Sequence, residues 1–171
     1  MRTLGSARSL VRFAAAGLVM AGLTTAAEAA GSTATSLTVG ASVANNCTIA
    51  TTQLSFGAYD PVGANASADA TGAGQVLIAC TKGATATIGL GNGGGSDVNS
   101  RRLASGTNFL PYQLYRGDGT TVWGGTAGTG AVSYNSLTKA PTTLTVQGKI
   151  PGGADVPEGT YTDTIVATVN F

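Results

Sequence analysis

The chain contains no histidine, and only 10% of its 171 residues are charged. Without an imidazole, a serine or cysteine nucleophile has no histidine base, and the commonest nitrogen ligand of metals is missing. The carboxylates are scattered through turns. Asp155 with Glu158, and Asp60 before Pro61, do not resemble a paired acid and base. We therefore expect no enzyme, with no catalytic residues, no metal site and no cofactor.

Charge is also too sparse and too balanced to attract a polyanion. Nine basic and eight acidic residues give a formal net charge of +1, and three of the arginines lie in the first twelve positions. A surface that binds nucleic acid or anionic lipid needs clustered lysine and arginine side chains. We therefore expect no nucleic-acid partner and no membrane-binding surface on the mature chain.

The first 29 residues have the features of a secretory signal peptide. The three arginines form a basic region, and the apolar run from Phe13 to Leu23 is too short to span a bilayer as an anchor. The residues AEA at 27–29 then supply a cleavage site of small residues. The alternative is a weak membrane anchor. We expect residues 1–29 to be removed during export and the mature chain to begin near Ala30.

The two cysteines, Cys47 and Cys80, both lie in the exported part of the chain. An even number of cysteines in an oxidising compartment favours a disulfide, and the alternative is two buried free thiols. A loop of this length would give a disulfide a stabilising effect of about 4 kcal/mol in the loop-entropy model.

The mature chain shows no sustained helical period, and the 26 glycines fit an all-β domain with many turns. Residues 57–74 are polar and glycine-rich, so we expect a long loop there. Arg101 and Arg102 suit a short edge strand, where charge discourages pairing with other chains. Trp123 is expected in the core. About six core strands are expected, in the segments 47–56, 75–81, 84–91, 109–115, 142–151 and 161–171.

The last of these segments is typical of the F strand of an immunoglobulin-like sandwich. Its start resembles the corner that precedes this strand, with Tyr161 as the corner residue in PEGTYTD. Asp163 shares the core-facing parity, and we expect backbone hydrogen bonds to satisfy its carboxylate. A G strand should follow F, and none does, so we expect a sandwich that is one strand short. The apolar core-facing residues that follow are Ile165, Ala167, Val169 and Phe171.

A further alternating segment precedes the body that carries the cysteines. One face of this segment carries Leu37, Val39, Ala41 and Val43. An isolated strand cannot bury such a face by itself. The segment can fold back into its own domain, or it can fill the gap in another copy, and the second arrangement builds a head-to-tail filament. Because alanine fills little of a pocket, we expect a shallow pocket opposite Ala41.

Seven stretches together resemble one known family. They are NNCTI, LSFGAYDP, IACT, PYQLY, VWG, GKIPGG and PEGTYTDTIVATVNF. In this order they resemble the spore coat protein U domain family, which includes subunits of archaic (Csu-type) chaperone–usher pili. The resemblance covers nearly the whole mature chain. It implies an all-β, incomplete immunoglobulin-like sandwich that lacks its last (G) strand and is completed by a donor strand from a neighbouring subunit.

The same resemblance implies a role for each part of the chain. Residues 30–44 match the donor-strand segment, and residues 45–171 match the incomplete pilin domain. Leu37, Val39, Ala41 and Val43 match the donor residues. The strand with Ile165, Ala167, Val169 and Phe171 matches the border of the groove that accepts the donor or the chaperone, next to the corner formed by Tyr161 and Asp163. Cys47 and Cys80 match the family's disulfide.

The function implied is a pilus shaft subunit that polymerises by donor-strand complementation for surface attachment and biofilm formation. Its partners would be identical or related subunits, a periplasmic chaperone and an outer-membrane usher. The protein would be located in the pilus fibre at the cell surface. The alternative is a self-associating secreted coat or matrix protein with the same fold. A tip adhesin is a further alternative, although tip subunits resemble two domains in tandem and this chain has the length of one.

Overall fold

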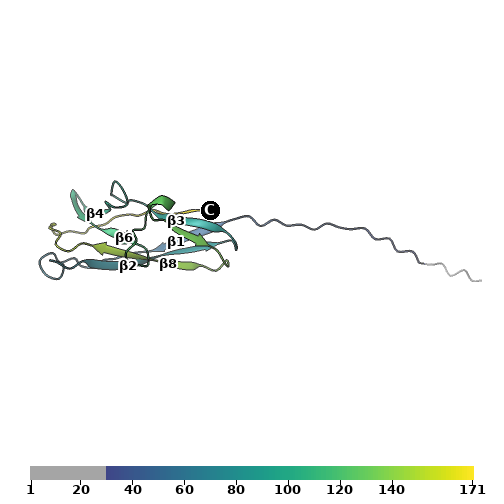
Figure 1. The fold of residues 1–171 in the computed structure, drawn as a ribbon, viewed down its shortest axis with the longest axis horizontal. Helices are drawn as coiled ribbons and strands as arrows, with labels where there is room; N and C mark the ends of the chain where they lie inside the picture. Colours follow the sequence, from purple (N-terminus) through teal and green to yellow (C-terminus); the bar gives the residue numbers. More distant parts are fainter. Residues whose placement is uncertain (1–29) are drawn as a thin grey trace, which may run out of the picture. The chain divides into compact units, whose positions relative to one another are not determined.

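The computed structural model describes residues 30–171, so the predicted signal peptide lies outside the described residues. Residues 30–46 are exposed and form no regular secondary structure. The remainder of the described chain contains nine β-strands and one short 3-10 helix, η1 (Ala127–Thr129), and no α-helix (Figure 1). Among residues 30–171, no helix is long and apolar enough to cross a bilayer.

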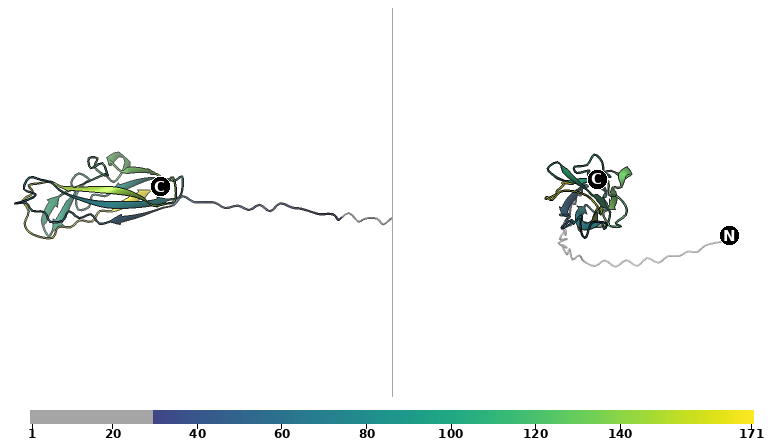
Figure 2. Two further views of the ribbon diagram at one scale, coloured as in Figure 1. Left: turned by 90° about the horizontal axis from the view of Figure 1, so that it is seen from below. Right: turned by 90° about the vertical axis from the view of Figure 1, so that its left-hand side faces the viewer.

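The strands form two facing antiparallel sheets and a separate hairpin (Figure 2). The four-stranded sheet has the order β1 (Cys47–Thr52), β2 (Ala70–Cys80), β8 (Thr142–Ile150), β6 (Gln113–Tyr115). The three-stranded sheet has the order β7 (Val132–Asn135), β3 (Thr85–Leu90), β9 (Ala167–Asn170). The hairpin consists of β4 (Arg102–Ser105) and β5 (Asn108–Pro111).

This order confirms the predicted fold class. An immunoglobulin-like sandwich has strands A, B, E and D in one sheet and C, F and G in the other. Here β1, β2, β8 and β6 take the positions of A, B, E and D, and β3 and β9 take those of C and F. Within residues 30–171 no strand takes the position of G, so β9 forms an edge of its sheet.

The core lies between the sheets and follows the predicted alternation of the strands. Val76 and Ile78 of β2 face Ile88 and Leu90 of β3, and each of the four is at most 3% exposed. Trp123 is fully buried, as predicted, and its indole N–H donates a hydrogen bond to the carbonyl of Ile88 at 3.0 Å. A buried tryptophan of this kind needs such a partner because its N–H cannot reach water.

A disulfide joins the first residue of β1 to the last residue of β2. Cys47 and Cys80 are direct partners in the antiparallel register, with their sulfur atoms 2.03 Å apart. This confirms the predicted pairing and ties the start of the domain to its central strand.

The long loop predicted at 57–74 is wrong in its last third. β2 begins at Ala70, five residues before the predicted start, and it includes Gly72 and Gly74. These glycines and Gly148 of β8 lie on the inward face, where the chain after β1 crosses them. A Cβ at Gly148 would lie 2.8 Å from the ring of Phe56 and 2.9 Å from Leu54. Glycine is therefore a packing requirement in these strands and does not mark a turn.

The prediction for Arg101 also needs correction. Arg101 does not protect an exposed edge, because it is 1% exposed and its guanidinium lies inside the sandwich. It donates hydrogen bonds to the carbonyls of Leu90, Gly91 and Trp123, and these bonds satisfy the buried cation.

The extent of some strands also differs from the prediction. Strand β7 was not predicted, because four residues between polar neighbours give too short a pattern. The predicted strands 47–56 and 161–171 are regular only at 47–52 and 167–170.

We predict that Gly148→Ala lowers the free energy of unfolding by about 1–3 kcal/mol, because the added methyl group displaces Phe56 and Leu54. Gly117→Ala is the matched control, since a Cβ there meets Thr145 only at 3.6 Å. Urea unfolding of the mature chain measures both. Equal losses in the two variants would show that Phe56 does not need this glycine.

Candidate functional site: an open groove beside β9

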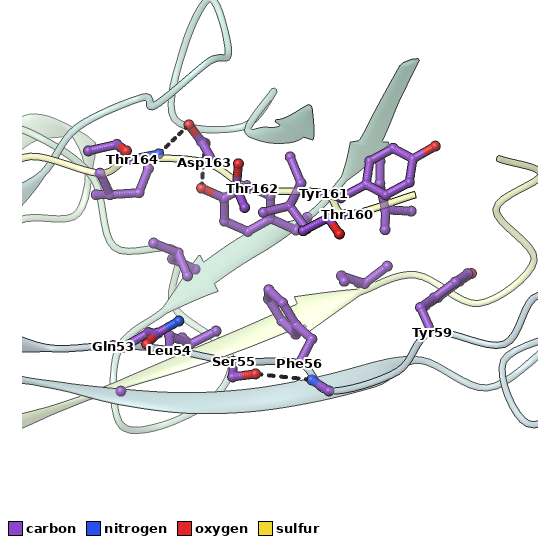
Figure 3. Close-up of a pocket in the computed structure, with 18 of the residues that line it drawn as sticks. Gln53, Leu54, Ser55, Phe56, Tyr59, Thr160, Tyr161, Thr162, Asp163 and Thr164 are labelled. Atoms are coloured by element: carbon purple, nitrogen blue, oxygen red, sulfur yellow. Dashed lines mark hydrogen bonds between the residues drawn. The ribbon is translucent and has the colours of Figure 1, made fainter. Parts of the chain in front are cut away.

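An open groove of about 1060 Å³ lies between two segments that are not in regular strands. One rim is formed by residues 53–59, which follow β1, and the other by residues 156–165, which precede β9 (Figure 3). The floor between the rims is the core of the sandwich. It includes Val76, Leu90, Leu103, Leu110, Leu114, Val146 and Ile150.

The backbone of the second rim has no strand on its groove side. Thr162 exchanges both of its backbone hydrogen bonds with Ala104, and the carbonyl of Val166 accepts one from the N–H of Gly91. Both residues thus direct their backbone groups away from the groove. Because these groups alternate along an extended chain, the odd-numbered residues direct theirs toward it. A strand laid into the groove would find donors and acceptors along this rim.

The predicted groove residues occupy three different settings. Ile165 and Ala167 line the groove and are half-buried. Val169 is half-buried and does not line the groove. Phe171 is 55% exposed. The lining of the groove therefore ends at Ala167.

The corner residues Tyr161 and Asp163 both line the groove. Tyr161 Oη donates a hydrogen bond to the carbonyl of Pro157 at 2.9 Å, which fixes the turn before the rim. The carboxylate of Asp163 accepts a hydrogen bond from the backbone N–H of Thr164 at 2.7 Å (Figure 3). It accepts another from the backbone N–H of Gly94 at 2.9 Å. It also accepts a hydrogen bond from Tyr112 Oη at 2.7 Å. A polar group with three donors thus lies beside the apolar floor of the groove.

Three further residues belong to this part of the site: Tyr112, Phe56 and Arg101. We call them, together with Asp163, the Asp163 centre. Sequence reasoning assigned none of the three to the site. Burial, together with the hydrogen bond to Asp163, raises the pKa of Tyr112. Burial lowers the pKa of Arg101, and the charges of Tyr112 and Asp163 partly offset this effect. The ring of Phe56 meets that of Tyr112 edge-on at 5.9 Å. The motifs LSFGAYDP and PYQLY carry two of these residues, but no periodicity distinguishes them.

The predicted donor residues are exposed. Leu37, Val39 and Val43 are 87%, 86% and 84% exposed, and Ala41 is also exposed. Three such apolar side chains, alternating in one short segment, leave an apolar face exposed to solvent.

The base of this segment is fixed at the disulfide-bearing end of the domain. Thr81, which follows Cys80, donates from its hydroxyl to the carbonyl of Ala44 at 3.1 Å. Its backbone N–H donates to the carbonyl of Asn46 at 2.9 Å, and its hydroxyl accepts from the N–H of Asn46 at 3.2 Å. The chain therefore leaves the domain at a defined place.

In residues 30–171, no three His, Cys, Asp or Glu side chains gather at a place that could hold a metal ion. The groove offers an apolar floor and a free backbone edge, which are features of a surface that binds an extended polypeptide.

Comparison with known proteins identifies the family. A model described as the Spore Coat Protein U domain matches residues 33–168, so the chain belongs to this family. The chain is 41% identical over 161 residues to Protein U of Myxococcus xanthus, covering 85% of this chain and 88% of that protein. The family is one of structural proteins, and the chain is not an enzyme.

A solved structure with a similar fold is the CsuC–CsuE chaperone–tip adhesion subunit pre-assembly complex from the archaic chaperone–usher Csu pili of Acinetobacter baumannii. The TM-score is 0.55 and the sequence identity 23%. The similarity covers 75% of this chain, which spans about two fifths (40%) of the matched chain.

We predict that Tyr112→Phe lowers the free energy of unfolding by about 1–3 kcal/mol, because it removes a donor from the Asp163 carboxylate. Tyr134→Phe is the control, since the Tyr134 hydroxyl contacts Thr142 at an exposed position. Thermal unfolding of the mature chain measures both. If Tyr112→Phe cost no more than Tyr134→Phe, the hydrogen bond to Asp163 would not support the groove.

Proposed function

We propose that this protein is a structural subunit of a chaperone–usher fibre that assembles by donor-strand complementation. Residues 30–44 form the donor segment, and residues 45–171 form the incomplete domain that receives it. The donor residues Leu37, Val39, Ala41 and Val43 of one copy enter the groove of the next copy. The observation that carries the proposal is the open groove, with its apolar floor and free backbone edge, in a chain that also exposes an apolar segment of matching period.

The donor residues fit within the length of the groove. The rim of residues 156–165 has ten residues, about 33 Å at the rise of a strand. The stretch from Leu37 to Val43 has seven residues, about 23 Å. Burying three large apolar side chains contributes roughly 1.5–3 kcal/mol for each, before the costs of ordering and association. Release requires the sandwich to open, so a slow unfolding rate governs the lifetime of the joint.

Strand direction favours a neighbouring copy over the chain's own segment. β1 is antiparallel to β2, a turn at 81–84 reverses the chain before β3, and β3 is antiparallel to β9. β1 and β9 therefore run in opposite directions. A segment that folds back from Asn46 along β1 would run parallel to β9. The missing G strand runs antiparallel to F, and a strand from another copy can take that direction.

Export and chaperone-assisted assembly are part of this proposal. A free groove is prone to aggregation, and we infer that a periplasmic chaperone covers it until an outer-membrane usher exchanges the chaperone for the next subunit. The similarity in fold to the chaperone–subunit complex of Csu pili supports this route. The product would be a fibre at the cell surface that mediates attachment and biofilm formation.

A second candidate is a self-associating coat or matrix protein. The identity of 41% to Protein U, and the family's description as a spore coat domain, favour it. Such a protein would use the same groove without an usher. The two candidates differ in what they need to reach the cell surface. The chain can be expressed in cells with and without a co-expressed chaperone and usher, because only the fibre subunit needs both.

We predict that the exported chain forms multimers that survive SDS without heating and dissociate on boiling. Removing residues 30–43, or replacing Val39 by Asp, abolishes them, because a charge cannot enter the apolar groove. Thr38→Asp is the matched control, since its side chain points to the other face of the donor strand. The multimers are measured on SDS gels of unheated samples from cells that co-express the chaperone.

The opposite result would be multimers in the truncated chain, or a stable monomer of the intact chain that needs no chaperone. Either would exclude donor-strand assembly.

A further inference from the structure

The backbone of β9 limits how a donor strand can pair with it. The odd-numbered rim residues direct both their backbone groups and their side chains to the groove side, because Thr162 and Val166 bond on the opposite side. In an antiparallel ladder, residues directly opposite each other place their side chains on the same face. An inward-facing donor residue must therefore lie opposite an odd-numbered residue. The register between the donor strand and β9 can therefore shift only in steps of two residues.

The end of the groove excludes one of these steps. Strands β1 and β9 (Ala167–Asn170) have Cα atoms within 8 Å of each other. A strand inserted between two others separates them by about 9.5 Å, so no donor fits there. Ala167 lines the groove and Val169 lies outside its lining. Leu37, the first large donor residue, can therefore lie opposite Ala167 but not opposite Val169.

The Asp163 centre excludes the step in the other direction. That step would set Val39 directly over Asp163, whose carboxylate is bonded to Tyr112, Gly94 and Thr164. A branched apolar side chain there would exclude water from a charged carboxylate that forms no salt bridge among the described residues. Ala41 is the smallest of the four apolar donor residues and adds the least apolar bulk over the carboxylate.

We propose that the donor strand binds antiparallel to β9 in the register that sets Ala41 opposite Asp163. The direct pairs are Leu37–Ala167, Val39–Ile165, Ala41–Asp163 and Val43–Tyr161. This register rests on the proposed function and adds the placement of each residue. It also pairs Leu37, the largest donor side chain, with Ala167, the smallest of the four rim side chains in these pairs. Asp163 is then a specificity-determining residue, which requires a small residue at this position of any subunit that follows.

Pairs of engineered cysteines in the full-length exported chain test the register. Direct partners have Cα atoms about 5.5 Å apart, within reach of a disulfide, whereas residues displaced by two lie about 7–8 Å apart. The variants Leu37→Cys/Ala167→Cys and Val39→Cys/Ile165→Cys are expected to give ladders that survive boiling and collapse with reductant. Leu37→Cys/Ile165→Cys and Leu37→Cys/Val169→Cys are expected to give none above background.

A second measurement does not depend on the engineered disulfides. Ala41→Val should lower the temperature at which the SDS-resistant multimers dissociate by several degrees, although it adds apolar surface, while Ala41→Ser should leave it nearly unchanged. A rise for Ala41→Val would overturn the placement of Asp163.

Cross-linking by a displaced pair alone, with boiling-sensitive multimers still present, would overturn the register and leave donor-strand assembly intact. The absence of multimers from the unmodified chain would overturn the proposed function and the register with it.

Discussion

The free edge of β9 is the constraint on which the rest of the structure depends. In an immunoglobulin-like sandwich this edge is covered by a G strand, and within residues 30–171 no strand covers it. Without that strand, the core between the sheets opens into a groove, and Ile165 and Ala167 are only half-buried. A row of free backbone donors and acceptors over an apolar floor is a template for another strand. Within residues 30–171 the fold therefore leaves this edge and the core beside it uncovered.

Several features hold the groove in shape before it is filled. The disulfide between Cys47 and Cys80 fixes the start of β1, and the glycines of β2 and β8 let Leu54 and Phe56 cross the inner face of the sheet. On the opposite rim, Asp163 ties the chain to Tyr112 and to the backbone of Gly94. A preformed groove reduces the cost of ordering when a strand binds. Incomplete structure and rigidity can thus coexist in one domain.

The sequence predicts the features that depend on alternation and composition: the all-β class, the disulfide and the buried Trp123. It also places Phe171 among the core-facing residues, yet that side chain is 55% exposed. It fails where tertiary contacts override local preference. Gly72 and Gly74 suggest a loop, yet they belong to β2, because Leu54 and Ser55 need the space above them. Arg101 suggests an exposed edge, yet three carbonyls and Gln113 satisfy it inside the sandwich. The shape of the groove depends on segments far apart in the sequence, residues 53–59 and 156–165, and no local pattern predicts it.

Hydrogen exchange at the backbone of the β9 rim tests the central claim most directly. The N–H groups of Asp163, Ile165 and Ala167 face the groove, whereas that of Thr162 is already bonded to Ala104. We predict fast exchange of the first three in the monomer that lacks residues 30–43, and exchange slowed by at least a hundredfold in the multimer, with Thr162 as the internal reference; a hundredfold corresponds to about 2.7 kcal/mol. Equally fast exchange of these amides in the multimer would show that no strand pairs with β9.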